Sequence, residues 1–372
     1  MRKILWLLLP LLALPLAGCW DSIEPKSRAF VLAIGLDAAP DGKVRLTISV
    51  PTSSGMGSQS GSTGGNGAAQ SYTLTADGRT FVEATQNVQL LLERSIYYGE
   101  VQAIVFGADL ARRGLRELIA ELMRYPLLDP LIYAVVSESP AGDLVGRITP
   151  GGRSVPRAIF SIYSTPASQA GVPQTRLWQV ARALLTPGED PLMAALMKGP
   201  EGTVPTIGSA IFHSGKLVAL LSGEDNLGLS FLRGTVDQAT MTVPFDGKDV
   251  QLQQVSAHTG IALLPPSADG LPRFRAHIRV QGQVASDPPG GPPWTPDELA
   301  RLEGATSERV KSLAERSFSL LQEKKSDVLL LGFRVHQLDP LLWSRLSWSE
   351  VFQQVNLEIR VDTTLTRIGN RP

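Results

Sequence analysis

A single cysteine, Cys19, is the residue of this chain whose chemistry is defined most sharply by its neighbours. It follows Leu16, Ala17 and Gly18, and this order matches the bacterial lipobox, in which the cysteine sulfur receives a diacylglyceryl group before a signal peptidase cuts ahead of it. Because Cys19 is the only cysteine in the chain, it can form neither an internal disulfide, a thiolate metal cluster nor a CxxC redox motif. The alternative is an ordinary secretory signal in which Cys19 is merely a small apolar residue. Lipidation is the favoured interpretation, because the one cysteine stands at the required place.

The segment before Cys19 has the organisation of a secretion signal. Met1-Arg2-Lys3 is followed by an apolar run over residues 4–16 and then by small residues. As a helix this run would span about 20 Å, which is short of the roughly 30 Å hydrocarbon core of a bilayer. We therefore expect residues 1–18 to be removed as a signal peptide. The mature chain should begin at Cys19, face outward and contact the membrane through its lipid, each buried methylene of which contributes about 0.8 kcal/mol.

Other residue types that carry chemistry form no recognisable site. The four histidines lie at least 19 residues apart and match no metal-ligand spacing: they are His213, His258, His277 and His336. No G-x-S-x-G motif is present. The carboxylate pairs at 224–225 and 297–298 fall at expected helix starts, where the helix dipole explains them. We predict no catalytic residue, no metal site and no cofactor, and an outward-facing enzyme with a site assembled from distant residues remains the weaker alternative.

Composition and charge narrow the class of protein. The 35 basic and 35 acidic side chains cancel, so nucleic acid is not an expected partner. The high glycine and proline content, with 19% charged residues, favours a loop-rich globular protein over a coiled coil or a charged tail. At roughly 100 to 200 residues per domain, the length predicts two or three domains.

Strands and helices intermix in the first half of the chain. Strands are expected at 29–36, 43–50, 71–75, 101–106 and 131–136. Thr80 and Glu83 form a capping box that predicts a helix, and a second helix is expected from Asp109 to Met123. Residues 51–70 are rich in serine and glycine and predict a flexible excursion between strands. Residues 149–205 contain many prolines and glycines, with a helix expected at 174–185, and form either a small module or a connection.

The second half opens with a predicted hairpin, with strands at 206–213 and 216–221 around Ser214-Gly215. Further strands are expected at 235–243, 250–257, 272–285 and 356–366, with a short helix at 225–232 and a stiff linker at 287–293. Thr295, Pro296 and Glu298 combine a capping box with proline at the first helical position, which predicts a long helix to about Lys324. Trp343 and Trp348 could form a ligand platform, but core packing is the commoner use. Together these elements predict an α+β, multi-domain fold of mostly antiparallel or mixed sheets covered by helices.

Three stretches in this order and spacing resemble the C-subunit family of spore germinant receptors, the GerAC or Ger(x)C lipoproteins. The first is the Gly18-Cys19-Trp20-Asp21 start with the run 30–37, which ends in Gly35-Leu36-Asp37. The second comprises residues 209–212, 215–218 and 228–234. The third comprises residues 327–333, Trp343, Trp348, Phe352 and the closing strand to residue 369.

This resemblance implies a domain division into residues 19–205 and 206–372. It also implies a non-enzymatic component of a nutrient receptor, held on the outer face of the inner spore membrane beside an A-type membrane subunit and a B-type subunit similar to amino-acid permeases. It carries over no ligand-contacting residue. A rival hypothesis is a solute-binding lipoprotein of a transporter, which predicts two similar α/β lobes around a cleft.

Overall fold

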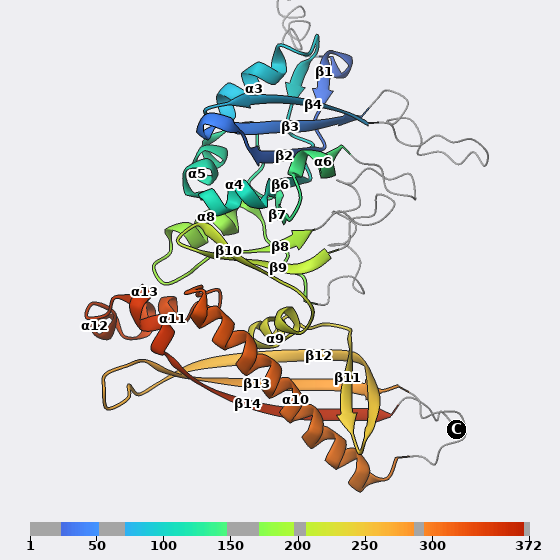
Figure 1. Cartoon of the computed structure of the whole chain (residues 1–372), viewed down its shortest axis with the longest axis vertical. Coiled ribbons are helices and arrows are strands. Elements are labelled where there is room, and N and C mark those ends of the chain that lie inside the picture. The colour runs from blue at the N-terminus through green and yellow to red at the C-terminus, as the bar shows by residue number, and fades with distance from the viewer. Residues whose placement is uncertain (1–23, 52–70, 147–170, 197–205, 286–293, 368–372) are drawn as a thin grey trace, which may run out of the picture.

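The computed structural model describes residues 24–51, 71–146, 171–196, 206–285 and 294–367. Figure 1 shows two bodies in an elongated molecule, an upper one around a large sheet and a lower one around a smaller sheet and a long helix. The described chain begins at the upper end, and its last strand lies in the lower body. The expected α+β, multi-domain architecture is confirmed.

The upper body is built on an eight-stranded mixed sheet in the order β10-β9-β8-β7-β6-β2-β3-β4. Strands β2, β6, β7 and β8 pair in parallel, and the pairs at both edges are antiparallel. Parallel strands buried on both faces are typically continuous apolar runs, as β6 and β7 are. The strands are β2 (Ala33–Ala38), β3 (Val44–Pro51), β4 (Ser71–Gly78), β6 (Ala103–Gly107), β7 (Tyr133–Ser137), β8 (Leu192–Leu196), β9 (Thr206–His213) and β10 (Lys216–Leu221).

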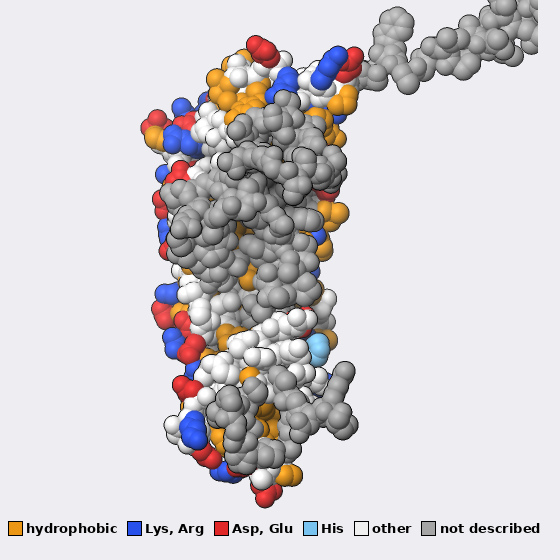
Figure 2. Space-filling view, turned by 90° about the vertical axis from the view of Figure 1, so that its right-hand side faces the viewer, with side chains coloured by type: hydrophobic (Ala, Val, Ile, Leu, Met, Phe, Trp, Pro, Cys, Tyr) orange, Lys and Arg blue, Asp and Glu red, His pale blue; other side chains and the backbone are white. Residues whose placement is uncertain are grey.

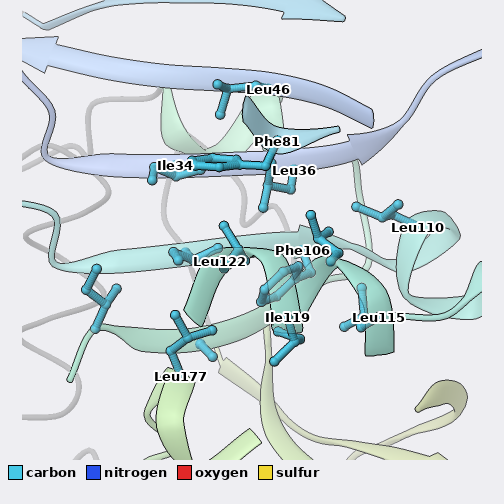
Figure 3. Close-up of a cluster of buried hydrophobic side chains, with 14 of the residues drawn as sticks. Ile34, Leu36, Leu46, Phe81, Phe106, Leu110, Leu115, Ile119, Leu122 and Leu177 are labelled. Carbon is cyan, nitrogen blue, oxygen red and sulfur yellow. The ribbon is translucent and has the colours of Figure 1, made fainter. Parts of the chain in front are cut away.

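Helices cover both faces of this sheet. One face carries the larger core, in which Phe81 and Phe106 pack among aliphatic side chains of the strands and helices (Figure 3). The other face is covered by α6, whose Leu144 and Val145 pack on β6 and β7. The helices are α3 (Phe81–Gln89), α4 (Ala108–Arg113), α5 (Arg116–Arg124), α6 (Ala141–Val145) and α8 (Leu177–Leu185). A separate parallel pair, β1 (Arg28–Phe30) with β5 (Ser95–Tyr97), lies at the upper end.

The lower body is a four-stranded sheet in the order β11-β12-β13-β14. Its last pair is parallel, because the long helix α10 carries the chain back between β13 and β14. Its elements are α9 (Gly223–Arg233), β11 (Ala239–Phe245), β12 (Lys248–Leu264), β13 (Arg273–Val284), α10 (Pro296–Glu323), α11 (Leu331–Leu338), α12 (Pro340–Trp343), α13 (Trp348–Val351) and β14 (Asn356–Arg367). Single 3-10 turns complete the fold at Pro25–Ser27, Pro40–Gly42 and Phe352–Gln354.

Local signals predicted several elements well. Thr295 and Glu298 form both hydrogen bonds of the capping box at the start of α10, and Thr80 caps α3 by accepting from the N–H of Glu83. The carboxylate of Glu83 instead accepts from the N–H of Arg79, at 3.0 Å. The predicted hairpin is present as β9 and β10, with Ser214 and Gly215 both at positive φ. Pro51, the first residue of the predicted excursion, ends β3, and the rest of the excursion, most of the small module and the linker lie outside the described residues.

Two expected elements are divided. The helix expected from Asp109 to Met123 breaks at Gly114, whose φ is +126°. The N–H of Leu115 there donates to the carbonyl of Gly215 in the hairpin turn, at 2.9 Å. Asp109 lies inside α4, which begins at Ala108, and therefore does not cap the helix. The strand expected at 29–36 divides into β1 and β2 because the chain leaves β5 and joins β3 and β6.

The hairpin β9–β10 belongs to the upper sheet. It pairs with β8, so this sheet extends to Leu221, whereas the expected domain division at residue 206 falls before the hairpin. Side chains of β8, β9 and β10, namely Leu192, Ile211 and Leu221, pack in the core of the lower body. The two bodies therefore share apolar packing across their junction.

Candidate functional site

The sequence-predicted site residues Leu16, Ala17, Gly18 and Cys19 lie outside the described residues. The four histidines are not brought together. His213 Nδ1 lies 3.4 Å from Asp190 Oδ2, and His277 Nε2 lies 2.6 Å from Asp362 Oδ2. The ring of His336 packs edge-on against Trp343. Within the described ranges, no group of three or more His, Cys, Asp or Glu residues could hold a metal ion.

Asp327 is a buried carboxylate at the junction of the two bodies. It follows α10 and is 2% exposed. Its Oδ1 accepts from the N–H of Leu331 at 3.1 Å, and its Oδ2 accepts from the N–H of Gly332 at 2.7 Å. Oδ2 also accepts from the indole Nε1 of Trp348, at 3.0 Å. The carboxylate thus fastens the first turn of α11 and the start of α13 to the end of α10.

Burial raises the pKa of Asp327 to about 7. The N–H donors of Gly332, Leu331 and Trp348 favour the charged form, but the loss of water around the carboxylate outweighs them, and the nearby Asp190 raises the pKa further. Asp327 therefore titrates near neutrality while every one of its hydrogen bonds remains internal to the protein.

Asp190 is the upper-body partner of Asp327. Its N–H donates to the carbonyl of Asp327 at 3.0 Å, and the N–H of Asp327 donates back to Asp190 Oδ2 at 3.1 Å. Asp190 Oδ1 accepts from the N–H of Ser214 in the β9–β10 turn, at 2.9 Å. One carboxylate thereby joins the segment before β8, the hairpin turn and the end of α10.

Glycines let the backbones approach at this junction. Gly188 has φ +71°, and its carbonyl accepts from the N–H of Phe333 at 3.1 Å. A Cβ on Gly332 would lie 2.4 Å from Trp348 Nε1 and 2.7 Å from the Cα of Gly188, so no side chain fits there. Ser326, fully buried, donates to the carbonyl of Phe212 at 2.5 Å. We name the set Gly188, Asp190, Ser326, Asp327 and Gly332 the interbody joint.

Trp343 and Trp348 pack against the core of the lower body, which agrees with the packing interpretation of these residues. Their ring centroids are 5.8 Å apart, and Trp348 also contacts Phe352 at 6.0 Å. Trp348 adds the hydrogen bond to Asp327.

A polar cleft of about 350 Å³ lies beside the joint. It is lined from the upper body by residues that include Gln179, Arg182 and Glu189, and from the lower body by Arg233 and Thr235. Arg182 pairs with Glu189 at 2.5 Å, while Arg233 Nη1 donates to the carbonyl of Val328 at 2.9 Å. Arg233 is open to the cleft, yet protein atoms surround its guanidinium, and this loss of water lowers the pKa of Arg233.

A second carboxylate serves the upper body in the same way. Asp37 ends the Gly35-Leu36-Asp37 stretch, and its two oxygens accept from the N–H groups of Ala141 at 2.7 Å and Gly142 at 2.8 Å, at the start of α6. Burial raises the pKa of Asp37. Gly107 is required beside it, because a Cβ there would lie 2.1 Å from Asp37 Oδ1. Asp37 therefore anchors α6 over the carboxyl ends of parallel strands β2 and β6.

In the part of the chain that the structure describes, three carboxylates act as hydrogen-bond acceptors that hold separate segments together. Both oxygens of Asp37, Asp190 and Asp327 accept hydrogen bonds from protein donors. Asp37, Arg233 and Asp327 all stand in the stretches that carry the family resemblance, but the sequence assigned them no role and did not single out Asp190. The only local signal for Asp190 is the turn-forming Pro187-Gly188 before it.

The sequence matches family models over both halves. Residues 21–197 match the spore germination protein N-terminal domain, and residues 207–369 match the spore germination B3/GerAC-like C-terminal domain. Two relatives match nearly the whole chain. Spore germination protein B3 of Bacillus subtilis (strain 168) is 21% identical over 96% of this chain and 95% of its own length. Spore germination protein KC of the same organism is 22% identical over 100% and 97%.

A solved structure has the same fold. The crystal structure of the GerBC protein superposes with a TM-score of 0.60 at 18% identity, covering 89% of this chain and 96% of that one.

Proposed function

Because the chain belongs to the GerAC-like family of spore germination proteins, the C-subunit family of spore germinant receptors, we propose that it is the lipid-anchored, non-enzymatic C subunit of a nutrient germinant receptor. In this role it supports assembly of the receptor or transmission of its signal. The observation that carries the proposal is the family match over both halves, in order, directly after the Leu16-Ala17-Gly18-Cys19 lipobox.

The proposed anchor is a diacylglyceryl thioether on Cys19, which would hold the protein to the outer face of the inner spore membrane. No helix within the described ranges is long and apolar enough to cross a bilayer. Two acyl chains would suffice for stable attachment, where a single chain is marginal.

The proposed partners are the A-type and B-type membrane subunits of the receptor. A subunit that transmits binding energy between partners must move as one unit or between few defined arrangements. The interbody joint supports this role, because Asp190 and Asp327 link the two bodies through a reciprocal pair of hydrogen bonds.

The rival hypothesis, a solute-binding lipoprotein, expects two similar lobes. The bodies here differ, since one has an eight-stranded mixed sheet and the other a four-stranded sheet with one long helix. The cleft beside Arg233 is the one feature of the described residues that favours this rival, and binding of a small solute to the isolated protein would revive it.

Gene deletion with complementation tests the proposal. Spores lacking the protein should lose the response to at least one nutrient germinant, with release of dipicolinic acid as the measurement, and a plasmid copy should restore it. A C-terminal affinity tag on the restored copy should recover A-type and B-type subunits from detergent-solubilised spore membranes. Normal responses to all germinants in a strain that also lacks its paralogues, with no membrane protein recovered, would contradict the proposal.

A further inference from the structure

The turn between α3 and β5 exposes two adjacent leucines at the upper end of the molecule. Leu90 is 84% exposed and Leu91 is 56% exposed. Large apolar side chains side by side in water indicate a surface that meets something apolar. Figure 2 shows hydrophobic side chains at this end with charged side chains beside them.

This turn is held firmly, so the exposure of its leucines is built into the fold. Leu90 and Leu91 donate their N–H groups to the carbonyls of Gln86 and Val88, at 3.2 and 3.0 Å. The side chain of Gln89 clamps the far side of the turn, donating to the carbonyl of Arg94 at 3.0 Å and accepting from the N–H of Ile96 at 2.9 Å.

The first described residues lie beside this turn. Strand β1 pairs in parallel with β5, with Arg28 opposite Ser95 and Phe30 opposite Tyr97. In a parallel pair both chains approach from the same side, so residues 24–27 and the turn that ends at Arg94 enter the pair from the same end. A tether attached before residue 24 would therefore hold the molecule at the end where the Leu90-Leu91 turn lies.

The length of chain before Glu24 limits how far the turn can be from a lipid at Cys19. Glu24 is five positions after Cys19, and even a fully extended chain of five residue steps spans at most about 18 Å. A lipid on Cys19 would thus confine this end of the body to the surface of the bilayer. Confinement of this kind raises the effective concentration of lipid near the turn, so that even a weak contact between the turn and the bilayer is occupied.

The charges around the turn suit the headgroup region. Lys26, Arg28 and Arg94 are basic, whereas Glu24 and Glu93 are acidic, and Lys26 pairs with Glu24 at the surface. With Asp21, which lies between Cys19 and Glu24, these side chains balance, so charge does not oppose an approach to lipid headgroups and the leucines supply the attraction.

We propose that the Leu90-Leu91 turn contacts the lipid bilayer, inserting its two leucines into the interface and setting the orientation of the body on the membrane. This rests on the proposed anchor at Cys19. The four-stranded sheet and the N-terminal part of α10 would then point away from the bilayer, because they form the opposite end of the molecule (Figure 1).

Site-specific fluorescence tests the proposal. The full chain, carrying Leu91→Cys labelled with an environment-sensitive dye, is expressed in a host that lipidates it and is reconstituted into phosphatidylcholine vesicles containing phosphatidylglycerol. We expect a blue shift of the dye emission and quenching by nitroxide placed near the lipid headgroup. Leu341→Cys is the matched control, since Leu341 is 73% exposed in α12 of the lower body, and its dye should show neither change.

Two further measurements separate the possible failures. The mass of the reconstituted protein reports whether Cys19 carries lipid; if it does not, a histidine tag in place of residues 1–19 on nickel-chelating vesicles supplies the same attachment point. The double substitution Leu90→Ser, Leu91→Ser should abolish quenching of a dye at Glu93→Cys while the protein stays on the vesicle. Equal quenching at positions 91 and 341, or none at 91 in a tethered protein, would overturn the proposal, and the latter would indicate that another protein covers the leucines.

Discussion

Asp190 and Asp327, which lie 137 residues apart in the chain, hold each other through a reciprocal pair of hydrogen bonds. The backbone N–H of Asp190 donates to the carbonyl of Asp327, and the N–H of Asp327 donates to the Asp190 carboxylate. Asp190 belongs to the upper body and Asp327 to the lower one, so this pair is where the two bodies are fastened. The two bodies are therefore joined by hydrogen bonds as well as by apolar packing.

Removal of the Asp190 carboxylate should loosen the joint. In Asp190→Ala the N–H groups of Ser214 and Asp327 lose their acceptor; Ser214 is exposed and can turn to water, but Asp327 is buried, and an unsatisfied buried donor costs roughly 1–3 kcal/mol. We expect the free energy of unfolding in urea to fall by about that amount or more. Asp269→Ala is the control, because Asp269 is exposed in the β12–β13 loop, and it should leave stability unchanged. Equal stability of both variants would contradict the assigned role of Asp190.

The titration of Asp327 predicts a specific pH dependence. Its pKa in the folded protein is about 7, above the ordinary value of 3.8, so the folded state holds a proton that the unfolded state has released. Between about pH 4 and pH 7 this group therefore makes the protein less stable as the pH rises, by up to roughly 1.4 kcal/mol per pH unit, and above pH 7 its contribution is constant.

Asp327→Asn removes this titration, and the comparison isolates it. The variant should be less stable at pH 5, because its amide NH₂ can accept no hydrogen bond from the surrounding N–H groups, whereas the hydroxyl oxygen of the protonated carboxyl still can. Its unfolding free energy should also vary less between pH 5 and pH 8 than that of the unaltered chain. Urea unfolding at both pH values measures the difference. Parallel pH profiles of the two proteins would show that Asp327 does not titrate in this range.

Gly332 and Gly304 form a matched pair of glycine positions in helices. Gly332→Ala places a Cβ 2.4 Å from Trp348 Nε1 and 2.7 Å from the Cα of Gly188, so α11 must shift, and we expect a loss of about 1–3 kcal/mol from overpacking. Gly304 lies at an exposed position of α10, where an added Cβ meets nothing within 4 Å. Gly304→Ala should therefore stabilise the protein by up to about 1 kcal/mol. Thermal unfolding should move in opposite directions for the two variants.

The cap on α6 can be tested in the upper body alone. Asp37→Ala leaves the N–H groups of Ala141 and Gly142 without their acceptor, and loss of such a cap costs about 0.5–2 kcal/mol. Asp109→Ala, which lines the same small pocket as Asp37 in the upper body, removes only an exposed pair with Arg112 and should have little effect. Hydrogen exchange of the α6 amides should speed up in the first variant and remain unchanged in the second.

The anchor makes its own prediction. Cys19→Ala removes the thiol to which a lipid would attach, so the protein should leave the membrane fraction and lose metabolic labelling with palmitate. A conservative Trp20→Phe change just after the lipobox should retain both. Retention of the Cys19→Ala protein on membranes in a strain without the partner subunits would show that another part of the chain binds the bilayer.

The sequence by itself determined the features that depend on neighbours along the chain. The α10 capping box rests on residues three positions apart, the β9–β10 hairpin on a two-residue turn, and the proposed lipid site on four consecutive residues, so their physical causes can be read locally. The family resemblance was predictable in the same manner, because it depends on the order and spacing of short stretches.

Only the tertiary structure decided which of these stretches meet. Asp37 and Asp327 stand in stretches that carry the family resemblance, but the donors to the Asp37 carboxylate lie 104 and 105 residues away. The backbone of Asp327 likewise pairs with Asp190, 137 residues away. The break at Gly114 likewise depends on the hairpin turn at Gly215. A buried carboxylate requires donors wherever the chain can bring them, and sequence spacing carries no information on contacts that form only when separate elements pack together.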